Sequence, residues 1–118
     1  MKRKTLRKHK DFIAPKNVLL ARSGAFWVKA LPTKTPDDAR YGLVVSKKSF
    51  KLAVQRNRAK RLIRDWIAFN QDLMLPQLDY IFFMNIEILE YNREHGRDDV
   101  KHALKRISKL YKKQDNDK

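Results

Sequence analysis

Short runs rich in β-branched and aromatic residues predict three strands. Two of them, residues 26–31 and 40–46, are separated by a segment, residues 32–38, that contains two prolines and reads as a loop. This arrangement makes an antiparallel pair plausible for the two runs. A third apolar run, residues 80–85, follows Pro76 and predicts another strand.

Apolar residues recur at three- and four-residue spacing from about residue 53 to residue 75, the pattern of an amphipathic helix. On a helical wheel, the polar and basic residues of the same segment cover a continuous arc on a different side. The helix is therefore expected to be apolar toward the core and cationic toward solvent. The stripe consists of Ala59, Leu62, Ile63, Trp66, Phe69 and Leu73, and the arc of Arg56, Asn57, Lys60, Arg61 and Arg64.

A second amphipathic helix is predicted near the end of the chain, from Val100 to Tyr111, with Asp98 as its N-cap. The polar stretch through Asn92, Glu94 and Gly96 reads as a loop, residues 114–118 form a polar tail, and residues 5–14 could form a short additional helix. The resulting order predicts one α+β domain spanning residues 1–118. We expect a two-layer sandwich, in which helices cover one face of a mixed sheet.

Strand parity predicts what lies on the two faces of that sheet. Phe26, Val28 and Ala30 share one face of their strand, whereas Trp27 and Lys29 share the other. The face with the large apolar residues should meet the helices. The other face would be an open trough with small residues in its floor, suited to an extended single strand of nucleic acid. An equally good interpretation is that the N-terminal segment merely covers Trp27.

Charge is concentrated in the first half of the chain. The 118 residues carry a formal net charge of +15, and residues 46–64 hold eight Lys or Arg and no acid. Because such clustering is self-repulsive, it indicates a polyanionic partner. Nucleic acid is favoured over an anionic membrane surface, because the aromatic residues continue into strand-like segments and the basic helix is therefore expected to pack on a sheet. We therefore expect an RNA-binding domain with a basic N-terminal stretch, residues 1–10, and no membrane partner.

Several chemistries lack their usual residues. The chain has no cysteine, which excludes disulfides and thiolate chemistry and fits a cytoplasmic location. Its serines lie in no Gly-x-Ser-x-Gly turn, and the side chains of its adjacent aspartates are expected to point apart and not to converge on a metal ion. No apolar run approaches the roughly 20 residues of a membrane helix. The basic start has no apolar segment behind it long enough for a signal peptide. No catalytic residue and no protein metal site are predicted.

The sequence resembles the protein subunit of bacterial ribonuclease P. The resemblance rests on Ser46-Lys47-Lys48 followed by Arg56-Asn57-Arg58 and then Lys60-Arg61-Leu62-Ile63-Arg64, and it covers roughly residues 6–113. It implies the order αβββαβα with a left-handed βαβ crossover, opposite to the usual hand. It also implies a catalytic RNA partner that, with Mg²⁺ bound mainly by the RNA, removes the 5′ leader of precursor tRNA. The protein itself would assist this cleavage without performing the chemistry, and no DNA partner is expected.

The resemblance also implies roles for individual residues. Six positions match the basic motif that contacts the catalytic RNA, Lys47 and Lys48 match the Ser-Lys-Lys segment, and Phe12, Trp27 and Lys29 fall at the leader cleft. The six motif positions are Arg56, Asn57, Arg58, Lys60, Arg61 and Arg64.

Three features depart from the family pattern. Lys16 stands where a second aromatic is usual, residues 49–55 form a longer segment without the usual glycine, and Lys29 replaces a common aromatic, which favours phosphate contact. Two other functions explain part of the sequence. A structural RNA-binding protein accounts for the charge but not for the motif spacing, and a protein-only ribonuclease needs an acid cluster that the sequence does not show.

Overall fold

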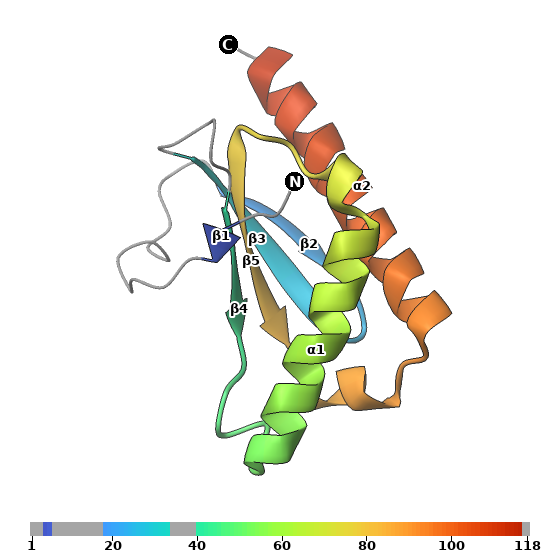
Figure 1. Ribbon diagram of the computed structural model, residues 1–118. Helices are drawn as coiled ribbons and strands as arrows, with labels where there is room; N and C mark the ends of the chain where they lie inside the picture. The colour runs from blue at the N-terminus through green and yellow to red at the C-terminus, as the bar shows by residue number, and fades with distance from the viewer. Residues whose placement is uncertain (1–3, 6–17, 34–39, 117–118) are drawn as a thin grey trace.

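The computed structural model describes residues 4–5, 18–33 and 40–116 (Figure 1). The described residues form a five-stranded sheet, two α-helices and two short 3₁₀ helices. The strands are β1 (Lys4–Thr5), β2 (Leu19–Arg22), β3 (Phe26–Pro32), β4 (Arg40–Val44) and β5 (Leu78–Met84). The helices are α1 (Ala53–Phe69), η3 (Gln71–Leu73), η4 (Ile86–Glu90) and α2 (Arg93–Asn116).

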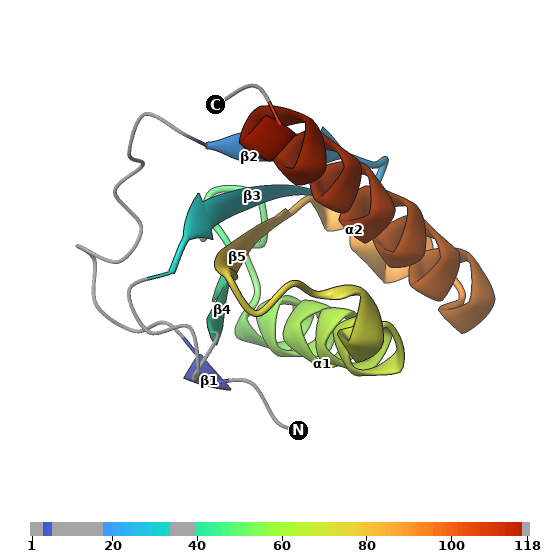
Figure 2. The same ribbon diagram turned by 90° about the horizontal axis from the view of Figure 1, so that it is seen from above.

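The sheet is mixed, with the strand order β1-β4-β5-β3-β2. β4 runs parallel to both β1 and β5, whereas β3 is antiparallel to β5 and to β2. The expected direct pairing of residues 26–31 with residues 40–46 is therefore wrong, because β5 lies between β3 and β4. Seen from above, with β4 and β5 running away from the viewer, the chain passes counterclockwise from β4 through α1 to β5 (Figures 1 and 2). The crossover is left-handed, as the resemblance implied.

Both α-helices cover the same face of the sheet, which confirms the two-layer α+β architecture (Figure 2). Phe26, Val28 and Ala30 of β3 point into this layer and are fully buried, as strand parity predicted. Ile63 and Trp66 of α1 are also fully buried against them. The apolar stripe of α1 thus places its basic arc on the outside of the molecule.

The first helix is shorter than the sequence predicted. α1 ends at Phe69, and Asn70 follows it with a buried side chain whose Nδ2 donates to the carbonyls of Trp66 and Arg97, both at 2.9 Å. This side chain fastens the end of α1 to α2. Leu73 lies in η3 instead of α1, and Phe69 is 63% exposed, so its assignment to the buried stripe was wrong.

The second helix is longer than predicted, because it begins at Arg93 and includes Glu94 and Gly96, which the sequence assigned to a loop. The side chain of Asn92 caps it: Oδ1 accepts the backbone N–H of His95 at 2.7 Å. Asp98 is therefore inside the helix and is not its N-cap. The helix also continues through residues 114–116, the first part of the predicted polar tail.

The N-terminal part differs from the sequence-based expectation in two ways. β2 was not predicted from residue patterns, although the resemblance implied a third strand before the basic helix. Thr5 lies in β1 and not in a helix, and the rest of the helix considered for residues 5–14 lies outside the described residues.

Candidate RNA interface

The N-terminal end of α1 concentrates positive charge. Lys47 and Lys48 lie exposed in the turn after β4, Lys51 is exposed just before the helix, and the first turn of α1 contains no acidic residue. The Gln55 side chain accepts the Leu52 backbone N–H at 3.2 Å, one half of a capping box. The helix dipole adds partial positive charge to these cations, because the first N–H groups of a helix have no partner within it. This end of the molecule should attract anions.

Arg56 differs from the other basic residues of the motif. Its Nη1 donates to the carbonyl oxygen of Phe50 at 2.7 Å and more weakly to that of Lys51 at 3.5 Å. Phe50 itself is fully buried, so this contact ties the loop before α1 to the core. The guanidinium has five N–H donors, so contact with RNA remains compatible with this bond. Arg56 therefore has a structural task that sequence reasoning did not predict.

The remaining motif positions lie on the outer side of α1, away from the buried side chains of Ala59 and Ile63. No carboxylate among the described residues forms an ion pair with any of them. An unpaired cationic face is suited to neutralising phosphates. Asn57, Arg58, Arg61 and Arg64 are exposed, and Lys60 is half-buried.

A second group of candidate residues lies on the opposite face of the sheet. The rings of Trp27 and Phe83 are stacked, with centroids 3.9 Å apart and planes inclined by 7°. The Nζ atom of Lys29 lies 5.6 Å from the Trp27 ring centroid and 5.7 Å from that of Phe83, within cation–π range. Trp27 and Lys29 are therefore together on the outer face, as predicted, and both are half-buried.

Phe83 was missed by sequence reasoning. Its signal was the alternation within the β5 run, which places Ile81 and Phe83 on the face opposite Tyr80 and Phe82. The expected floor of small residues is present only at Gly42. The residue paired with it on β5 is Ile81, a large apolar side chain that is fully buried. The outer face therefore has an apolar floor with an aromatic pair beside it.

The two groups of residues are joined by β4. Val44, the last residue of this strand, pairs with Phe83, which stacks on Trp27, and the basic turn with Lys47 and Lys48 follows directly. Phe12 and Lys16 lie outside the described residues. The basic turn therefore lies between the aromatic face and the cationic side of α1.

The described part of the chain holds neither a cluster of metal ligands nor a helix that could span a membrane. Across residues 4–5, 18–33 and 40–116, no three His, Asp or Glu side chains lie close enough to hold a metal ion. In the same residues, neither α-helix is long and apolar enough to span a bilayer.

Comparison with known proteins shows which family the chain belongs to. The family model described as Ribonuclease P matches residues 1–108. The chain belongs to the ribonuclease P protein family. Among solved structures, the RNase P protein of Staphylococcus aureus is 28% identical, with a TM-score of 0.73, and the alignment covers 92% of this chain and 98% of that one. The RNase P protein of Thermotoga maritima is 26% identical, with a TM-score of 0.73 and coverage of 89% and 98%.

Curated ribonuclease P protein components are similar over shorter segments. That of Lactobacillus delbrueckii is 36% identical over 80 residues, covering 68% of this chain and 66% of the relative. That of Pseudomonas entomophila is 60% identical over 45 residues, which is 33% of its length. The matched segments thus span between a third and just under two thirds of these relatives.

Proposed function

We propose that this ribonuclease P protein binds the catalytic RNA through the outer side of α1 and the turn before it. The observation that carries the proposal is the unpaired, acid-free cationic face of α1, which runs from Arg56 to Arg64. Its spacing on successive helical turns suits a series of backbone phosphates. Lys47 and Lys48 extend the same charge beyond the N-terminus of the helix.

The 5′ leader of precursor tRNA is the proposed ligand of the aromatic face. Each base stacked on an aromatic side chain contributes roughly 1–3 kcal/mol, largely independent of sequence. The stacked rings of Trp27 and Phe83 provide such a surface, and the ammonium group of Lys29 beside them can meet a phosphate. The same protein would then contact both the catalytic RNA and its substrate, with Phe12 as a further proposed cleft residue.

The catalytic chemistry is assigned to the RNA. Mg²⁺ would be bound mainly by RNA phosphates, because the cationic surface of α1 repels a divalent cation and attracts the polyanion that holds it. The protein would neutralise phosphate repulsion where the two RNAs meet. It would thereby assist Mg²⁺-dependent removal of the leader and formation of the mature 5′ end, in the bacterial cytoplasm.

The deciding experiment is cleavage of precursor tRNA at low Mg²⁺ in four mixtures. They contain buffer, the protein, a bacterial ribonuclease P RNA, and the protein with that RNA. The proposal predicts efficient formation of mature 5′ ends only in the combined mixture. Cleavage by the protein alone would indicate a protein-only ribonuclease, and no stimulation of any cognate RNA would indicate a structural RNA-binding role.

Salt dependence gives an independent check of the proposed surface. About six phosphate contacts predict a slope of roughly −4 to −5 in the logarithm of the binding constant against the logarithm of salt concentration. A flat dependence would contradict an electrostatic interface.

A further inference from the structure

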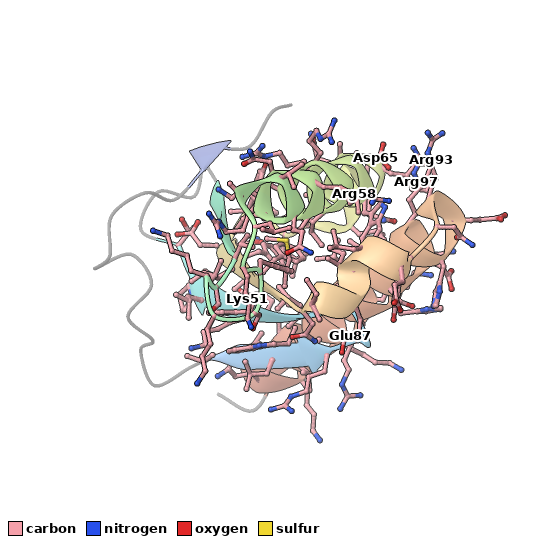
Figure 3. All side chains as sticks on the ribbon, turned by 90° about the horizontal axis from the view of Figure 1, so that it is seen from below. Lys51, Arg58, Asp65, Glu87, Arg93 and Arg97 are labelled. Atoms are coloured by element: carbon pink, nitrogen blue, oxygen red, sulfur yellow. The ribbon has the colours of Figure 1, made fainter. Side chains whose placement is uncertain are left out.

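A basic pocket lies between α1 and the first turn of α2. We call it the α1–α2 notch. It has a volume of about 300 Å³, and Figure 3 shows Arg58 and Asp65 of α1 near Arg93 and Arg97 of α2. The notch is lined by Arg58, Arg61, Leu62, Asp65, Trp66 and Arg93. Neither the motif on α1 nor the aromatic face includes Arg93.

The one carboxylate in the lining is already neutralised. Asp65 accepts from Arg97 twice, with Nε to Oδ2 at 3.2 Å and Nη2 to Oδ1 at 3.1 Å. The same guanidinium stacks on the Phe69 ring, 4.2 Å from its centroid. This second contact holds Arg97 in place, so that Asp65 remains paired with it. The charge of Asp65 is therefore balanced by a residue outside the lining of the notch.

Three guanidinium groups in the lining are left without a counter-charge. No carboxylate among the described residues forms an ion pair with Arg58, Arg61 or Arg93. Three unbalanced cations around one pocket repel each other, and this repulsion is relieved when an anion binds between them. The buried Trp66 ring and Leu62 form an apolar wall that lowers the local dielectric constant, which strengthens that attraction.

We propose that the α1–α2 notch binds a backbone phosphate of RNA and that Arg93 is an RNA-binding residue. This inference rests on the proposed function and extends the RNA-binding surface from α1 onto α2. Arginine is suited to the task because its planar fork can donate two parallel hydrogen bonds to one phosphate. A pocket of about 300 Å³ is large enough for a phosphate group with several bridging waters.

The test compares two single charge removals on the same helix, in the full chain bound to a ribonuclease P RNA. Arg93→Gln removes the proposed contact, and Arg106→Gln removes a charge that is also exposed and lies about 20 Å further along α2. We expect Arg93→Gln to weaken RNA binding roughly 3- to 10-fold at moderate salt and to reduce the salt slope by about 1. Arg106→Gln should leave both quantities close to those of the wild type.

The outcomes separate this inference from the proposed function. If the wild type binds RNA with a steep salt slope but the two variants behave alike, the notch is not an RNA site and the proposed function stands. If the wild type itself does not bind ribonuclease P RNA, the proposed function fails first. Thermal unfolding of both variants controls for folding.

A second measurement keeps the inference testable if Arg93→Gln is unstable. Since the chain has no cysteine, Glu94→Cys provides a unique attachment site for an iron chelate that cleaves nearby RNA with hydroxyl radicals. Cleavage of the bound RNA from position 94, and none from the control variant Arg106→Cys, is the expected result. No cleavage from position 94 would place the first turn of α2 away from the RNA.

Discussion

Replacing Gly96 should destabilise the fold, because α1 and α2 approach closely at this residue. A Cβ atom built on Gly96 would collide with three atoms of the Trp66 ring: Cε2, Cζ2 and Cδ2. Gly96 does not have a positive φ, so its role is to leave space and not to supply an unusual backbone conformation. The Gly96→Ala substitution therefore tests helix packing directly.

Two opposing effects determine the result of Gly96→Ala. Alanine is favoured over glycine inside a helix by about 1 kcal/mol. Overpacking a core costs about 1–3 kcal/mol, and the upper part of that range applies because the Trp66 ring is rigid and fully buried. Asn70 also links the two helices, which limits their separation. We expect a net destabilisation of about 1–2 kcal/mol, or a fall in Tm of about 5–10 °C.

Thermal and urea unfolding of a double-mutant cycle would measure this effect. In the Trp66→Phe background, where the ring is smaller, Gly96→Ala should be close to neutral or stabilising, so the coupling energy should be large. A rise in Tm of the single Gly96→Ala variant would refute the close approach. Equal effects of the substitution in both backgrounds would show that the clash is not with Trp66.

Further predictions concern other parts of the molecule. Trp66→Ala should lower the free energy of unfolding by about 3–5 kcal/mol, since the ring is fully buried; an unchanged Tm would contradict its place in the core. Arg56→Ala should cost about 1–2 kcal/mol through its lost bonds to the preceding loop, whereas Arg58→Ala should reduce RNA binding without changing Tm; similar Tm values for the two variants would exclude this division of tasks. Burial, reinforced by the charge and hydrogen bond of Asp99, raises the pKa of Tyr91 above 10.0. The stabilisation by the neutral phenol is thus complete below pH 10.0 and lost as the pH rises through the raised pKa, so wild type should lose more stability than Tyr91→Phe in this window when urea unfolding is followed against pH; equal losses would refute the effect.

Local patterns in the sequence determined much of the fold and of the candidate interface. Parity placed Trp27 and Lys29 on the face opposite the core, and the helical period separated Ala59 and Ile63 from the basic arc. These predictions succeeded because side-chain direction within one strand or helix depends only on nearby backbone geometry. The basic motif, which carries the family resemblance, lies within the same short stretch.

The sequence did not determine where the helices end. α2 begins before Asp98, the residue predicted to cap it, because Asn92 caps it instead, and Gly96 then lies inside the helix, where it packs against the Trp66 ring. α1 ends at Phe69, whose ring lies at the surface beneath Arg97 and not in the core. The end of α1, where Asn70 bonds to α2, and the place of Gly96 against Trp66 depend on contact between the two helices, which no local period reports.

Tertiary structure alone decided which distant side chains meet. Phe83 stacks on Trp27 because β5 is inserted between β3 and β4, and this strand order is not encoded in the period of any single strand. Asp65 pairs with Arg97, 32 positions later, and thereby leaves the guanidinium of Arg93 beside those of α1 without a counter-charge. The sequence fixes the types of side chain and their local direction, whereas the packing of α1 against α2 and the register of β5 determine which of them form a site.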